Sequence, residues 1–159
     1  MKKLSTWRLV LLFLVCAGTA FAQPSSAVVA TVDEAKWGPA PPFLPPGAQL
    51  AVVSGNPMGN GAYAVRLRFP ANYLIPAHSH PTDENVVVAS GALTFGMGDK
   101  LEKTAAGNKT LTTGGYALAA ANMNHFAFTG AQPATIVLYG VGPVEFKYVN
   151  PSDDPRNKK

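Results

Sequence analysis

The chain has 159 residues, of which 47% are hydrophobic and 14% are charged, and these values are typical of one folded globular domain. No low-complexity tract or long run of one charge interrupts it, which excludes a repetitive or strongly charged chain. The formal net charge is +4, but three of the positive charges lie within the first eight residues. The charge therefore gives no support for a protein that binds nucleic acid or membranes.

The N-terminus has the three parts of a secretory signal peptide. A positive head is followed by an uninterrupted apolar run, residues 9–17, and by a small-x-small cleavage signal, Ala20-Phe21-Ala22. A transmembrane anchor is the alternative, but it needs about 20 apolar residues, and this run is shorter. We therefore predict that residues 1–22 are a signal peptide. The mature protein is then exported, periplasmic or secreted, with no stable membrane association.

Cleavage after Ala22 changes two properties of the protein. Ten Lys and Arg then remain against nine Asp and Glu, so the mature chain is nearly neutral. The only cysteine, Cys16, leaves with the signal, which excludes disulfides, cysteine nucleophiles and thiolate metal sites from the mature protein. Attachment of a lipid to Cys16 is a minor alternative, disfavoured because Val15 stands where a small residue is expected.

Residues 23–48 are predicted to form an N-terminal extension. Its first part, residues 23–33, has no regular pattern, and residues 37–47 contain five prolines. Because proline cannot donate to a strand ladder or sit inside a helix, the second part is predicted to be an extended strap on the domain surface. Trp37 and Phe43 are the side chains expected to hold it there.

Residues 49–149 are predicted to be a β-barrel domain. Short apolar runs alternate with turns rich in Gly, Pro and Asn, a pattern typical of an antiparallel all-β sandwich or barrel. Residues 99–108 have room for a helical turn, and the polar residues 150–159 are predicted to be a frayed C-terminal tail. Strands are predicted at residues 49–54, 62–69, 73–78, 84–90, 92–97, 110–119, 124–129, 133–140 and 143–149.

The strand predicted at residues 62–69 shows the clearest alternation. Val65, Leu67 and other apolar residues fall on one face, whereas Arg66 and Arg68 fall on the other. We expect the arginine face to be solvated, with a pocket-facing arginine as the less favoured alternative.

The three histidines of the chain and one glutamate form a candidate metal site. His78 and His80 are two residues apart in a predicted strand, so both side chains project from the same face. Glu84 follows a bend at residues 81–83, and His125 comes from a later strand. Three imidazole nitrogens and one carboxylate oxygen suit a divalent transition metal. Four protein ligands leave a coordination position open to a small molecule when the metal takes five or six ligands.

The same residues resemble the motifs of the cupin family. His78, His80, Glu84 and Gly91 match the first motif, H-x-H-x3-E-x6-G. The second motif, G-x5-P-x-G-x2-H-x3-N, is matched less closely, by Gly114 and His125. The departures from the family pattern are Asn72 and Asn122, where glycines are expected, Ala120 in place of a proline, and Thr129 in place of an asparagine.

The resemblance implies an antiparallel jelly-roll β-barrel with one metal ion inside its mouth, and it makes a homodimer an expected assembly. It does not fix the reaction. A metal-dependent oxygenase, isomerase or decarboxylase that acts on a small organic molecule is one hypothesis. A non-catalytic periplasmic protein that binds a metal or small ligand is the alternative, and a structural metal is the least favoured.

Two further expectations concern the pocket and the metal. By alternation from the ligands, Val86, Val88, Ala127 and Thr129 face the pocket, which favours a modest, mostly hydrophobic substrate; Asp83 is a weak candidate for a residue that supports a ligand. The signal has no twin arginine, so export of the unfolded chain is expected. Metal loading outside the cytoplasm then favours Zn or Cu by intrinsic affinity, with Fe, Mn and Ni as the alternatives.

Overall fold

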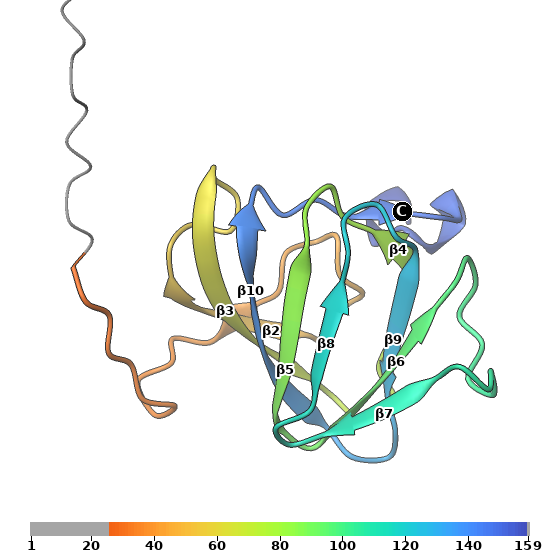
Figure 1. Cartoon of the computed structure of the whole chain (residues 1–159), viewed down its shortest axis with the longest axis horizontal. Helices are drawn as coiled ribbons and strands as arrows, with labels where there is room; N and C mark the ends of the chain where they lie inside the picture. The colour runs from red at the N-terminus through yellow and green to blue at the C-terminus, as the bar shows by residue number, and fades with distance from the viewer. Residues whose placement is uncertain (1–25, 159) are drawn as a thin grey trace, which may run out of the picture.

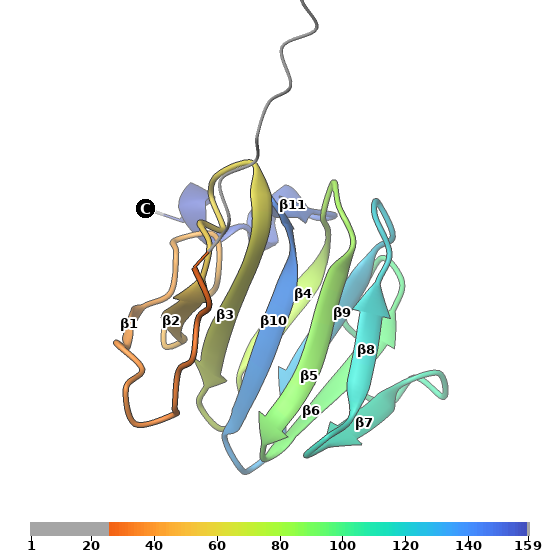
Figure 2. The same cartoon turned by 60° about the vertical axis from the view of Figure 1, so that its left-hand side comes forward.

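The computed structural model describes residues 26–158, and the predicted signal peptide at residues 1–22 lies outside them. The described residues form two antiparallel sheets that face each other (Figures 1 and 2), so the prediction of an all-β jelly-roll fold is confirmed. Within this part of the chain, no helix has the length and apolar character needed to cross a bilayer.

Six strands form the first sheet and five form the second. The first has the order β1 (Gly38–Pro39), β2 (Gln49–Ser54), β3 (Gly61–Phe69), β10 (Ala134–Gly142), β5 (Glu84–Ser90) and β8 (Tyr116–Ala119). The second has the order β11 (Lys147–Tyr148), β4 (Leu74–Ser79), β9 (His125–Thr129), β6 (Ala92–Met97) and β7 (Lys109–Thr112). Consecutive strands pair in β1–β2, β2–β3 and β6–β7, whereas the other neighbours, such as β3 and β10 or β4 and β9, come from distant parts of the chain.

The alternation along β3 separates the core from the outer surface. Its inward residues are buried, including Phe69, which is 1% exposed. Its arginines point away from the core, as expected, and contact the N-terminal extension. The Arg66 Nη1 donates to the Thr31 carbonyl at 2.9 Å, and the Arg68 guanidinium lies 4.2 Å from the centre of the Trp37 ring. The arginine face is therefore an outer surface that the extension partly covers.

The proline-rich strap is more deeply integrated than its sequence indicates. Phe43 stacks on Phe146 with ring centres 4.8 Å apart, and its carbonyl accepts a hydrogen bond from the Tyr148 hydroxyl at 2.7 Å. Leu44, which the sequence analysis did not single out, is 5% exposed and belongs to the core. The strap thus closes one end of the space between the sheets.

A buried side-chain contact joins the end of β9 to residues 70–73, which precede β4. The Thr129 hydroxyl donates to the Pro70 carbonyl at 2.7 Å and accepts from the Tyr73 amide at 2.8 Å. Thr129 is 1% exposed, so it satisfies two buried backbone groups that water does not reach.

Two of the predicted strands are wrong in extent. Residues 110–119 do not form one strand, because a turn at Gly114 sends β7 and β8 into different sheets. Residues 143–149 contain only the two-residue strand β11, and residues 143–146 have no ladder partner. Pro143 lacks the N–H that a ladder needs, which is consistent with the end of β10 at Gly142.

Two shorter expectations are also corrected. Residues 99–108 form hydrogen-bonded turns rather than a helical turn. In one of them, the backbone N–H of Asn108 donates to the Ala105 carbonyl at 3.0 Å. The C-terminal tail is not frayed within the described residues. It forms two 3-10 helices, η1 (Pro151–Asp153) and η2 (Pro155–Asn157), whose N-terminal amides are capped by the side chains of Asn150 and Asp154.

Candidate metal centre

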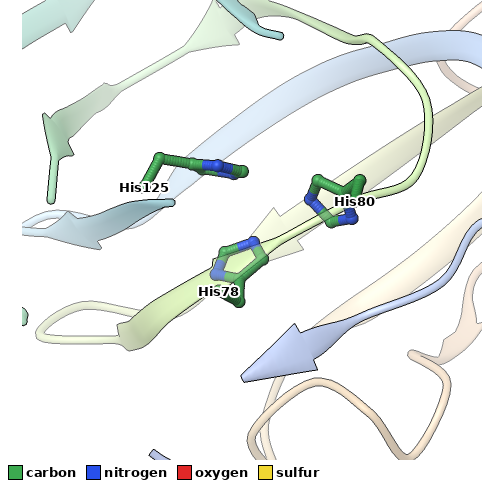
Figure 3. Close-up of side chains that lie close together, drawn as sticks. All are labelled: His78, His80 and His125. Carbon is green, nitrogen blue, oxygen red and sulfur yellow. The ribbon is translucent and has the colours of Figure 1, made fainter. Parts of the chain in front are cut away.

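The structure brings the three predicted histidine ligands together between the sheets, and it places Glu84 beside two of them, His80 and His125. His78 lies on β4, His80 directly follows that strand, Glu84 begins β5, and His125 begins β9. All four are buried, with exposures between 1% and 6%. One ligand nitrogen from each histidine lies within 4.8 Å of the others, and Figure 3 shows the three rings gathered around a common space.

Strand pairing explains this convergence. His78 on β4 is the direct antiparallel partner of His125 on β9, and their ring centres are 4.3 Å apart. Glu84 is placed by the other sheet, where it pairs with Gly140 and Ala119. The site therefore lies where the two sheets face each other, and neither sheet could form it alone.

Each histidine donates a hydrogen bond from its Nδ1 atom to a backbone carbonyl. The acceptors are Pro76 for His78 (2.8 Å), Glu145 for His80 (2.7 Å) and Met123 for His125 (3.1 Å). A carbonyl oxygen can only accept, so the neutral ring holds its proton on Nδ1 and carries the free lone pair on Nε2. This arrangement also fixes the ring orientation, as in histidines that bind metals.

The donor set fits a divalent transition metal. The His80 Nε2 atom is fully buried and has no hydrogen-bond partner within residues 26–158. It lies 3.4 Å from Glu84 Oε1, and the His125 Nε2 atom lies 3.9 Å from Glu84 Oε2. An unpartnered buried nitrogen next to a carboxylate is a position that a cation, either a metal ion or a proton, would satisfy.

Burial controls the protonation of two of the histidines. Together with the charges of the neighbouring imidazoles, it lowers the pKa of His78 well below its ordinary value. Burial also lowers the pKa of His125, although Glu84 opposes the shift. Burial acts in the same direction on His80, but the Glu84 carboxylate and the Glu145 carbonyl outweigh it, so the pKa of His80 is raised. His78 and His125 are therefore neutral near pH 7, as metal ligands must be.

The candidate ligands lie at the polar end of an apolar cavity of about 90 Å³. His78, Glu84 and His125 line it together with side chains from the core and the strap. Of the four positions that alternation assigned to the pocket, Val86 and Ala127 line the cavity. Val88 and Thr129 are instead buried in packed regions beside it.

Asp83 supports the site indirectly. Its Oδ1 atom accepts a hydrogen bond from the Ala121 amide at 2.8 Å, within the turn that leads to His125. The same turn is held by the backbone N–H of Asn122, which donates to the His80 carbonyl at 2.7 Å. Asp83 thus contacts the backbone that presents a ligand, and has no hydrogen bond to a histidine among the described residues.

Three aromatic residues of the site were missed by the sequence analysis. Phe146 stacks on His78 with ring centres 4.2 Å apart, and Phe95 stacks on His125 at 5.1 Å. Tyr63 lines the cavity, and burial, followed by the charge of Glu84, raises the pKa of its hydroxyl, so this group keeps its proton. Extending the alternation of residues 65, 67 and 69 by one step would have placed Tyr63 on the inward face.

The two asparagines that replace expected motif glycines have left-handed backbone conformations. Asn72 has φ of 56° and Asn122 has φ of 62°. Asparagine is among the few residues other than glycine that adopt this region readily, so the turn geometry is kept. The motif glycine Gly91 has φ of 76°, and a Cβ there would lie 2.2 Å from the Pro133 carbonyl oxygen. This close approach explains why that position needs glycine.

Comparison with solved structures identifies the fold. A provisionally assigned acetylacetone dioxygenase from Methylibium petroleiphilum is 20% identical, with a TM-score of 0.63 over 85% of this chain and 89% of that one. An RmlC-like cupin from Ralstonia eutropha is 16% identical, with a TM-score of 0.60 over 82% of this chain and 76% of that one.

The chain has the cupin fold. The polyketide cyclase RemF from Streptomyces resistomycificus is also similar, with 14% identity and a TM-score of 0.63 over 82% of this chain and 90% of that one. No family model matches the sequence, and no curated protein sequence matches it. At these identities the similarity shows the cupin fold alone.

Proposed function

We propose that this cupin is an exported, metal-dependent enzyme that acts on a small, mainly apolar organic molecule. The observation that carries the proposal is the cluster of three histidines beside Glu84, of which His78, His125 and Glu84 line an otherwise apolar cavity. The signal-like pattern at residues 1–22 supports export. Zn or Cu is the proposed metal for an exported protein, by the order of intrinsic affinities, with Fe, Mn and Ni as alternatives.

In this proposal, His78, His80 and His125 would hold the ion through Nε2, and Glu84 would hold it through a carboxylate oxygen. When bound, the ion would supply Lewis-acid or oxygen-dependent chemistry at a position that the protein leaves open. The apolar lining excludes water from this end of the cavity. Tyr63 keeps its proton and, as a cavity-lining donor without a hydrogen bond to any described residue, is placed to donate to an oxygen of the bound molecule.

The cavity sets the size of the substrate. A single water molecule needs about 10–15 Å³ of cavity volume. A cavity of about 90 Å³ therefore has room for roughly six to nine non-hydrogen atoms. The lining favours a ligand that is mostly hydrocarbon, with an oxygen-bearing group directed at the histidines. Oxidative cleavage, isomerisation and decarboxylation are the proposed reaction classes. The similar folds named above include an assigned dioxygenase and a cyclase, which is compatible with chemistry on small organic molecules.

Elemental analysis tests the metal site. Residues 23–159 are purified from the exported fraction beside His125→Ala and the exposed control Lys109→Ala. We expect about one transition-metal ion per chain in the parent and the control, and loss of the ion in His125→Ala. A parent that contains no metal and takes up none on addition would contradict the proposal. Recovery of stoichiometric manganese or iron would overturn the preference for Zn or Cu.

A non-catalytic binding protein is the second candidate, favoured by the small number of polar groups that line the cavity. Cobalt-loaded protein titrated with azide separates an open site from a closed structural one. A change in the visible cobalt spectrum on azide addition supports a site that can accept a substrate, whereas an unchanged spectrum indicates a structural metal. An open site without saturable turnover of small oxygen-bearing compounds would favour the binding protein. Homodimer formation stays a prediction, which sedimentation velocity would test.

A further inference from the structure

His80 differs from the other two histidines in the origin of the carbonyl that orients it. His78 and His125 each donate to the carbonyl two residues earlier in their own segment, at Pro76 and Met123. His80 instead donates to the carbonyl of Glu145, which is 65 residues away. The orientation of His80 therefore depends on the position of a distant peptide.

That peptide belongs to a segment without ladder hydrogen bonds. Residues 143–146 follow β10 and precede β11, and no strand pairs with them. At its start, the Val144 amide donates to the Pro57 carbonyl at 2.7 Å. At its end, the Phe146 carbonyl accepts from Arg156 Nη2 at 2.9 Å. The Glu145 carbonyl lies between these two attachments.

The guanidinium of Arg156 is itself held in place. Its Nε donates to Asp154 Oδ1 at 2.8 Å, and its Nη2 donates to Asp154 Oδ2 at 2.7 Å. Asp154 also caps η2 by accepting from the Arg156 amide at 2.9 Å. Such a two-pronged pair has a defined geometry, so the guanidinium has a fixed direction when it reaches the Phe146 carbonyl.

Phe146, whose carbonyl accepts the hydrogen bond from Arg156, also contacts two candidate ligands directly. The Phe146 ring lies parallel to His78 at 4.2 Å, with an interplanar angle of 11°, and meets the edge of His80 at 4.5 Å. Glu145 and Phe146 together thus contact His80 by a hydrogen bond and by ring packing. A shift of this dipeptide would change the direction of the His80 lone pair.

We propose that Arg156 is a positioning residue for the metal site, acting on His80 through the Glu145–Phe146 peptide. This inference rests on the proposed function, because it assigns His80 as a ligand. Arg156 is partly exposed and does not touch the candidate ligands. Its effect is therefore on ligand orientation, and it is comparable to the carbonyl and carboxylate partners of histidines that bind metals, whose loss weakens affinity by roughly 10–100-fold.

Arg156→Ala tests the proposal in the full mature chain, with the exposed Lys158→Ala as the matched control and Arg156→Lys as the conservative variant. Zinc affinity is measured by competition with a chromophoric chelator. We expect affinity to fall roughly tenfold in Arg156→Ala, to stay at the parent value in Lys158→Ala, and to recover in part in Arg156→Lys. The lysine keeps a donor for the Phe146 carbonyl but loses the two-pronged contact with Asp154.

A spectroscopic measurement separates positioning from general destabilisation. The Nδ1–H proton resonances of His80 and His125 are followed by NMR, with and without zinc. In Arg156→Ala, the His80 proton should shift and exchange faster with water, whereas the His125 proton should not change. Equal changes at both histidines, or a lower melting temperature with unchanged zinc affinity, would show a structural role only and overturn the inference.

Failure of the inference is distinguishable from failure of the proposed function. If the parent takes up no divalent transition metal, the proposed function fails, and the His80 proton in the metal-free protein still reports whether Arg156 positions this ring. If the parent binds zinc and Arg156→Ala binds it equally well with an unchanged His80 proton, the inference alone fails.

Discussion

The histidines of the site are supported in two different ways. His78 and His125 lie on paired strands, β4 and β9, and each is oriented by a carbonyl of its own segment. His80 lies just beyond β4 and is oriented by the ladder-free segment at residues 143–146. Ligands of the first kind are set by strand geometry, whereas a ligand of the second kind is set by the packing of a distant part of the chain.

Removing a strand-borne ligand is expected to have the largest effect. His78→Ala deletes a predicted ligand and also the ring that stacks on Phe146. Metal content after dialysis should therefore fall from about one ion per chain to near zero, as measured by elemental analysis. His80→Ala should lose the metal as well, but it keeps the parallel stack, so its metal-free form should melt at a higher temperature than that of His78→Ala. A lower melting temperature for His80→Ala than for His78→Ala would show that the stack of His78 on Phe146 does not stabilise the fold.

Glu84→Gln sharpens the comparison by removing charge with little change in shape. We expect metal affinity to fall by at least about tenfold, since an anionic ligand and its attraction for the ion are lost. The same change should lower the pKa of His80 in the metal-free protein, because the Glu84 charge raises it. An NMR pH titration of the imidazoles measures this shift. An unchanged or increased pKa of His80 would show that Glu84 does not act on this ring.

Thr129→Val affects a buried contact outside the candidate ligand set. The substitution leaves the Tyr73 amide and the Pro70 carbonyl without their buried partner, which should cost about 1–3 kcal/mol in the free energy of unfolding. Metal affinity, measured as for the parent, should not change. A loss of affinity comparable to that of Glu84→Gln would show that this contact and the ligands are coupled.

Tyr63→Phe should have the smallest effect. The hydroxyl forms no hydrogen bond with the described residues, so the free energy of unfolding should stay within about 1 kcal/mol of the parent in urea denaturation. Metal content should also be unchanged, because Tyr63 is not a candidate ligand. A larger loss of stability would assign the hydroxyl to the core and remove it from the proposed contacts with substrate.

Much of the fold followed from local pattern. Alternation along residues 62–69 and frequent turn residues predicted an all-β domain, because a strand with one buried face repeats every two residues. The i,i+2 pair of His78 and His80 placed two rings on one face for the same reason. The extent of the strands was less predictable, since residues 110–119 look continuous in sequence yet divide between two sheets at Gly114.

The remaining features of the site depend on contacts between distant residues. Nothing in the local sequence around Phe146 indicates that its ring stacks on His78, or that the preceding carbonyl binds His80. The polar composition of residues 150–159 predicted a frayed end, whereas Asp154 and Arg156 form a fixed contact there. Charged residues near a chain end are usually solvated, so only their position beside residue 146 distinguishes these two.

The sequence by itself determined the strand-forming character of the chain, the signal-like N-terminus and the set of candidate ligands, because hydrophobic period, residue type and short spacing are local properties. The tertiary structure decided the cavity, the choice of Nε2 as the free lone pair and the distant support of His80. These depend on which strands pair and which loops meet them. Such pairing is fixed by burial over the whole domain rather than by any one segment.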